Sequence, residues 1–191
     1  MDNIKAVVIG SSSGGINALS FILERLPADF KIPVLVVQHL HAESEGYWID
    51  LINKKSNVIV KEADNKENIQ EGHVYIAPPD YHLLVDYDDT IALSKDEKVN
   101  FSRPSVDVLF ESASDVYGTR LAGIVLTGAN DDGAQGLKRI KEKGGITIVQ
   151  DPAEAAYKEM PEAAIRKSKT DFILSLHGIV EFLKKSNIKI R

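Results

Sequence analysis

Residues 4–15 are Ile-Lys-Ala-Val-Val-Ile-Gly-Ser-Ser-Ser-Gly-Gly, and this stretch decides the fold of the chain. The β-branched run over 4–9 is typical of a buried strand. The apolar residues that follow, at positions 16, 19, 22, 23 and 26, have helical spacing and predict a helix over 14–26. A buried strand that passes through a glycine-rich loop into a helix is the start of a βαβ unit. The stretch therefore favours a parallel sheet with helices packed on it.

The same alternation of strand and helix continues to the end of the chain. Further strands are predicted over 32–37, 58–61, 72–77, 121–126, 146–150 and 172–174, and helices over 46–55, 104–116, 134–143, from about 160, and over 176–185. Segments 82–85 and 90–93 flank a turn and predict a hairpin. We expect an α/β fold of three layers (α/β/α), in which a doubly wound, mainly parallel sheet carries one antiparallel hairpin. Without a linker or repeat, residues 1–191 are expected to form a single domain.

Pro104 suits the first position of the helix predicted over 104–116.

Composition and charge exclude several classes of function. The 191 residues carry a net charge of −5, which argues against a nucleic-acid partner. The absence of cysteine excludes disulfides, thiol catalysis and thiolate metal sites. No apolar run approaches the length of a membrane span, and the N-terminus does not resemble a signal peptide. We therefore expect a cytoplasmic protein that does not insert into a membrane.

The loop over 10–15 permits two interpretations. A glycine-rich loop between strand and helix is commonly a phosphate-binding turn, but the dinucleotide fingerprint needs glycine where Ser12 stands, and the P-loop lysine is absent. The loop also fits G-x-S-x-G through Gly10, Ser12 and Gly14, the pattern that exposes a nucleophilic serine on a sharp turn. Both a binding module for a nucleotide or phosphate and a serine hydrolase stay open.

Two further loops after predicted strands carry groups that a serine nucleophile would need. His39 follows the strand over 32–37, and Asp131 and Asp132 follow the strand over 121–126. A serine needs a base, and the base needs a carboxylate that holds its tautomer. Ligands of such sheets bind beyond the carboxyl ends of the strands, where these loops lie. The chain order serine, histidine, aspartate differs from that of the lipase and esterase superfamily.

Several segments match one family in the family's own order. These are Val8–Gly15, Val37–Leu40, Tyr75–Pro78, Arg103–Phe110, Leu126–Gly128 with Asp132–Ala134, and Met160–Ala164. With them the chain resembles the catalytic domain of chemotaxis protein-glutamate methylesterases, the CheB type. The resemblance implies hydrolysis of glutamate methyl esters on the cytoplasmic domain of methyl-accepting chemotaxis receptors, and deamidation of receptor glutamines. It also implies that Ser12 is the nucleophile, His39 the base and Asp132 the carboxylate that orients His39.

The chain departs from the family pattern at a few positions. Ser13 stands where threonine is common, Ala129 replaces a methionine, Asn130 replaces a glycine, and 41–47 lacks the usual proline-rich turn. These departures keep open a non-catalytic chemotaxis scaffold. The family's N-terminal receiver domain does not fit ahead of the first strand, so control by phosphorylation within this chain is not expected. His39 and His41 form an H-x-H pair without a carboxylate cluster, and we expect neither metal nor cofactor.

Overall fold

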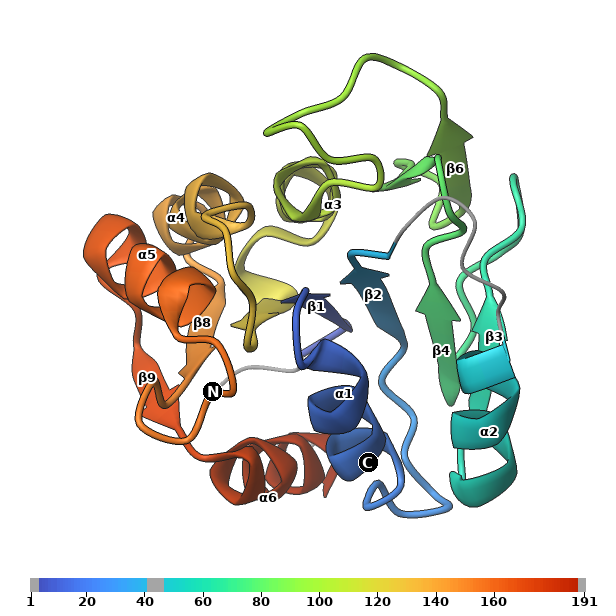
Figure 1. Ribbon diagram of the computed structural model, residues 1–191. Coiled ribbons are helices and arrows are strands. Elements are labelled where there is room, and N and C mark those ends of the chain that lie inside the picture. The colour runs from blue at the N-terminus through green and yellow to red at the C-terminus, as the bar shows by residue number, and fades with distance from the viewer. Residues whose placement is uncertain (1–3, 41–46, 189–191) are drawn as a thin grey trace.

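A seven-stranded parallel sheet forms the centre of the molecule (Figure 1). The computed structural model describes residues 4–40 and 47–188. The strands lie in the order β3-β4-β2-β1-β7-β8-β9. Their bounds are β1 Ala6–Ser11, β2 Val34–Gln38, β3 Ile59–Glu62, β4 His73–Ile76, β7 Leu121–Val125, β8 Ile146–Gln150 and β9 Phe172–Leu174. The predicted parallel sheet is thus confirmed, with each strand boundary within two residues of its expected place.

The first strand lies in the middle of this sheet because all six of its side chains are buried. It pairs in parallel with β2 on one side and with β7 on the other. In both pairings the partner of Gly10 is the last or next-to-last residue of its strand, Val37 in β2 and Val125 in β7. The three strands therefore end at the same level, and the loops that follow them meet at one edge of the sheet.

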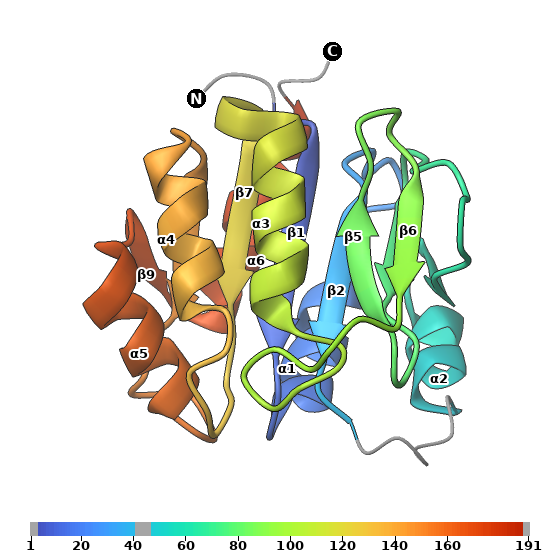
Figure 2. The ribbon, with the colours of Figure 1, turned by 90° about the horizontal axis from the view of Figure 1, so that it is seen from above.

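Helices cover both faces of the sheet, as Figures 1 and 2 show. One face carries α1 (Gly15–Leu23), α2 (Tyr47–Lys55) and α6 (Leu176–Ile188). The other face carries α3 (Val106–Tyr117), α4 (Ala134–Glu142) and α5 (Glu159–Ser168). Two separate clusters of buried apolar residues fill the two interlayer spaces. This is the doubly wound, three-layer architecture that the sequence predicts.

A short hairpin lies outside the main sheet and packs on α3. Its strands, β5 (His82–Val85) and β6 (Ile91–Ser94), pair in antiparallel register. Leu83, Val85 and Ile91 are buried in the same apolar cluster as the first turns of α3. The antiparallel hairpin is therefore confirmed, and it fixes the side of α3 that faces away from α4.

The beginning of α3 differs from the expectation. Pro104 does not occupy the first helical position, because the helix begins at Val106 and Ser105 is its N-cap residue. The Ser105 side chain does not bond to the helix's own N–H groups. Instead, the carboxylate of Asp132 accepts hydrogen bonds from the N–H groups of Val106 and Asp107, at 2.7 and 3.1 Å. Asp132, which is distant in sequence, therefore sets the start of this helix. The local pattern around Pro104 carries no information about that contact.

Candidate active site

The loop between β1 and α1 places Ser12 at the edge of the sheet and hides its neighbour. The hydroxyl of Ser11 is buried and donates a 2.7 Å hydrogen bond to Oε1 of Gln38. Ser12 is half-buried, and its main-chain N–H bonds to the carbonyl of Thr127 in the loop after β7. Of these two serines, Ser12 faces the pocket described below.

The two glycines of the G-x-S-x-G pattern are each required for a different physical reason. A side chain on Gly10 would place its Cβ 2.2 Å from Cγ1 of Val106, so only glycine lets α3 begin this close to β1. Gly14 has a φ of 78°, in the left-handed region that glycine adopts without strain. The two glycines therefore permit the tight turn on which Ser12 stands.

Gln38, the last residue of β2, ties the serine loop to the histidine loop. Its Nε2 donates to the carbonyl oxygens of Ser12 and His39, at 2.8 and 2.9 Å. Its Oε1 accepts the hydroxyl of Ser11. Sequence reasoning gave Gln38 no role; the one available signal is a polar residue at the end of an otherwise apolar strand. Gln38 holds the backbone of both loops at a fixed spacing.

The structure brings His39 and Asp132 into direct contact. Nε2 of His39 lies 2.9 Å from Oδ2 of Asp132, whose side chain is only 1% exposed. Burial opposes ionisation of Asp132, but the hydrogen bonds from His39 and Val106 outweigh it and hold the pKa of this carboxyl below its ordinary value. An ionised Asp132 accepts the Nε2–H proton and leaves a lone pair on Nδ1. The neighbouring Asp131 is exposed and outside this contact.

Two asparagines, which sequence reasoning did not include among the predicted site residues, complete the polar cluster. Nδ2 of Asn100 donates to Asp132 at 3.1 Å and to Asp107 at 2.8 Å. Nδ2 of Asn130 lies 3.4 Å from the hydroxyl oxygen of Ser12 and 3.2 Å from Nδ1 of His39. Among the described residues, no hydrogen bond joins Ser12 directly to His39. The two side chains are instead bridged by the Asn130 amide.

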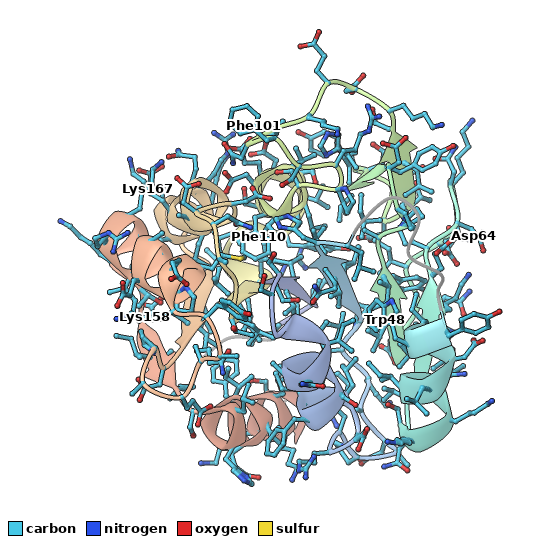
Figure 3. All side chains as sticks on the ribbon, viewed as in Figure 1. Trp48, Asp64, Phe101, Phe110, Lys158 and Lys167 are labelled. Carbon is cyan, nitrogen blue, oxygen red and sulfur yellow. The ribbon has the colours of Figure 1, made fainter. Side chains whose placement is uncertain are left out.

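A pocket of about 870 Å³ opens at this edge of the sheet. Its wall includes Ser12, His39 and Asn130, together with the first residues of α1. Arg103 also lines the pocket, and its guanidinium pairs with Asp80 at 2.7 Å. Phe101, also in the wall, is 97% exposed; Figure 3 shows it on the loop before α3, whereas Phe110 of α3 lies inside the molecule. Its volume lies in the range of pockets that hold small-molecule ligands, and Ser12 is part of its wall.

Neither a metal-binding cluster nor a membrane-crossing helix is found over residues 4–40 and 47–188. No three acidic or histidine side chains in this part of the chain are grouped closely enough to hold an ion. His41 and the segment to residue 46 lie outside the described residues.

Comparison with protein families gives one match across this fold. The family model described as CheB methylesterase matches residues 7–183, which include all seven strands of the sheet except the first residue of β1. The chain belongs to the CheB methylesterase family.

Relatives of this CheB-family chain are found at high coverage. A relative from Leptospira interrogans is 52% identical over 99% of this chain and 100% of its own length. A Clostridium acetobutylicum protein named protein-glutamate methylesterase/protein-glutamine glutaminase is 38% identical over 96% of this chain, which spans 53% of that protein. The crystal structure of the Thermotoga maritima CheB methylesterase catalytic domain is 34% identical and superposes with a TM-score of 0.91, covering 95% of this chain and 97% of that one. The CheB-family chain therefore has the fold of that catalytic domain.

Proposed function

We propose that this chain is a serine hydrolase that demethylates glutamate methyl esters of methyl-accepting chemotaxis receptors and deamidates receptor glutamines. One observation carries the proposal: Ser12, His39 and Asp132 lie together, on loops after three adjacent strands, in a chain of the CheB methylesterase family. Relatives in Clostridium acetobutylicum and Archaeoglobus fulgidus carry both activities in their names. A phosphate-binding turn or a scaffold would have no need for Ser12, His39 and Asp132 together at one edge of the sheet.

In the acylation step, Oγ of Ser12 attacks the carbonyl carbon of the methyl ester. Nδ1 of His39 takes the hydroxyl proton, while Asp132 holds the Nε2–H and stabilises the imidazolium. The tetrahedral intermediate collapses when the C–O bond to the methoxy group breaks. His39 returns its proton to that oxygen, so methanol leaves and the glutamyl group stays as an ester on Ser12.

In the deacylation step, water replaces methanol and the same groups act again. His39 takes a proton from the water, and the resulting hydroxide attacks the acyl carbon. The bond to Oγ of Ser12 breaks, and His39 protonates Ser12. The carboxylic acid that forms loses its proton to solvent and leaves as glutamate. A glutamine side chain follows the same path, with ammonia as the group that leaves in the first step.

The oxyanion of both intermediates needs hydrogen-bond donors beside Ser12. The N–H groups of Ser13 and Gly14 border the pocket at the start of α1 and donate to no acceptor within the described part of the chain. We assign them this role. Their position ahead of the helix places them where the helix dipole favours negative charge.

The proposal also covers the setting of the reaction. The substrate is the cytoplasmic part of a receptor, so we place the protein in the cytoplasm. Residues 1–191 are treated as one catalytic domain, which is supported by the single seven-stranded sheet and by the family match over 7–183.

The test of the proposed function compares two adjacent serines. Methanol release from a methylated receptor fragment is measured for the unmodified chain, Ser12→Ala and Ser11→Ala. Ser12→Ala is expected to abolish release, because the nucleophile is gone. Ser11→Ala is expected to keep substantial turnover, because Ser11 is buried behind the pocket wall and its hydroxyl bonds to Gln38 and not to His39. Equal loss in both variants, or full activity in Ser12→Ala, would overturn the proposal.

A further inference from the structure

The amide of Asn130 contacts both the candidate nucleophile and the candidate base. Its Nδ2 lies 3.4 Å from Oγ of Ser12 and 3.2 Å from Nδ1 of His39. Its side chain is half-buried in the pocket wall, between the two groups and next to the substrate space. Within the described residues, the Ser12 hydroxyl and Nδ1 of His39 are each hydrogen-bonded to this amide and not to one another.

The orientation of the Asn130 amide is fixed by its other end. Oδ1 of Asn130 accepts a 3.0 Å hydrogen bond from the main-chain N–H of Asp132, so the amide nitrogen must face Ser12 and His39. An amide nitrogen only donates. Because Asp132 takes the Nε2–H of His39, Nδ1 carries the lone pair, and Asn130 donates to that lone pair. The base is therefore hydrogen-bonded to a group other than the serine.

We propose that Asn130 is a latch that keeps Ser12 unreactive until a substrate entering the pocket displaces its amide. This inference rests on the proposed function. Once the amide has moved, the Ser12 hydroxyl can turn to Nδ1 of His39 and give up its proton. The imidazolium then has N–H groups at both nitrogens and cannot accept from Asn130, so the latch stays open until His39 loses that proton. Asn130 is thus a positioning residue, which acts through Ser12 and His39.

A latch has a distinct kinetic consequence. A small reagent has little binding energy with which to displace the amide, so the latch lowers its rate of reaction with the free enzyme. A receptor displaces the amide with part of its binding energy, and the latch is open in the bound complex. Removing the latch should therefore lower KM for the receptor and leave kcat unchanged.

The first measurement uses a fluorophosphonate reagent, without receptor, and maps the adduct by mass spectrometry. Asn130→Ala is compared with the unmodified chain and with Asp131→Ala, which removes a polar side chain one residue away that is exposed to solvent. Labelling of Ser12 is expected to be about tenfold faster in Asn130→Ala, the size of effect that one neutral hydrogen bond carries. Asp131→Ala should label at the unmodified rate.

The second measurement determines kcat and KM of the same three proteins with a methylated receptor fragment as substrate. Asn130→Ala is expected to have KM lowered by about the same tenfold factor, with kcat unchanged. A fall in both kcat and labelling rate would show that the amide stabilises the transition state, and the latch would be wrong. Unchanged rates in a folded variant would also overturn it. Asn130→Gly lacks the amide as well and serves if Asn130→Ala does not fold.

The same data separate failure of the latch from failure of the proposed function. If the adduct in the unmodified chain maps to a residue other than Ser12, the proposed function is wrong. If it maps to Ser12 at equal rates in all three proteins, the hydrolase stands and the latch alone is wrong.

Discussion

Asp132 receives hydrogen bonds from three separate parts of the chain. Among the described residues its donors are His39, Asn100, Ser105, Val106 and Asp107. One of these is the candidate base, one lies on the loop before α3, and three form the start of α3. A single buried carboxylate thus joins the proposed chemistry to the boundary of a helix.

We expect Asp132→Asn to lower turnover by a factor on the order of 10⁴. The amide would present a donor or a weaker acceptor to Nε2 of His39, so the tautomer with a free Nδ1 is no longer favoured. Asp131→Asn is the matched control and should have little effect, because Asp131 is exposed and has no part in this contact. Methanol release from methylated receptor measures both, and equal losses would mean that the wrong aspartate has been assigned.

The same substitution should change stability with a definite pH dependence. The folded-state pKa of Asp132 is lowered, against an ordinary value of about 3.9 in the unfolded chain. Its contribution to the free energy of unfolding is therefore complete above about pH 4 and is lost as the pH falls below that value. We expect Asp132→Asn to cost about 2 kcal/mol at pH 7, because donors are left without a full acceptor.

Thermal unfolding checks this dependence. The difference in Tm between the two proteins, about 6 °C at pH 7, should shrink below pH 4. Burial and the neighbouring Asp132 charge raise the pKa of Asp107, which gives Asp107 the opposite trend. The part due to Asp132 is missing in the variant, so it offsets some of this decrease without reversing it. A difference in Tm that stays constant from pH 7 to pH 3 would contradict the assignment.

At this scale, the sequence predicts which loops carry the polar groups and leaves the contacts between loops undetermined. The loops that carry Ser12, His39 and Asp132 stand out because each follows a predicted strand, whereas the choice of Asp132 over Asp131 comes from the family resemblance. Asn100 was not among the predicted site residues. Its contact with Asp132 depends on a loop in which Asn100 and Phe101 adopt left-handed backbone, with φ of 50° and 60°. No periodic pattern encodes such a conformation, so the position of that amide is known only from the fold.

At the scale of elements, α3 and α4 pack closely on the face of the sheet that also carries α5. A Cβ on Gly136 of α4 would lie 2.5 Å from Cβ of Phe110 and 3.1 Å from Cα of Asp107. The N–H of Gly136 also donates a 2.6 Å hydrogen bond to the Asp107 carboxylate. The two helices therefore touch through backbone, which cannot move aside as a flexible side chain can.

Gly136→Ala is expected to destabilise the fold by about 1–3 kcal/mol, because α4 must move away from α3. Gly178→Ala in α6 is the matched control. The atoms nearest to its added Cβ are side-chain atoms at 3.2 Å or more, and alanine has the higher helix propensity. Urea unfolding measures both variants. A Gly136→Ala protein as stable as Gly178→Ala would show that the contact between α3 and α4 is looser than the structure indicates.

Helices and strands were predicted well because their apolar spacing is strong. The apolar faces of α1 and β1 are continuous, and both elements lie where the pattern places them. The start of α3 was placed two residues early, since Pro104 fits a helix start locally and the true boundary is set by Asp132. Local sequence patterns thus predict that an element exists, whereas tertiary hydrogen bonds determine at which residue it begins or ends.

For the molecule as a whole, the pocket lies at the carboxyl edge of the sheet with Ser12 in its wall. The CheB methylesterase family model matches residues 7–183 of the chain. We therefore expect the 191-residue chain to release methanol from methylated receptor at the same rate with and without a small phosphodonor. Release only in the presence of the phosphodonor would reveal a regulatory partner or segment.

A small soluble ester should be a poor substrate in the same assay. Contacts between the receptor and the surface around the pocket contribute to positioning in the transition state, so a truncated substrate is expected to lower kcat as well as raise KM. A small ester hydrolysed with the kcat of the receptor would show that those remote contacts are not used.

The double role of Asp132 affects how this protein would evolve if its chemistry were no longer selected. The Ser12 hydroxyl has one hydrogen bond among the described residues, at 3.4 Å, so mutation there would cost the fold little. Asp132 would be kept by selection for stability alone, because the first turn of α3 depends on it. A descendant that retains the aspartate and has lost the serine would be a folded pseudoenzyme. In such a lineage the serine, and not the aspartate, records when catalysis ended.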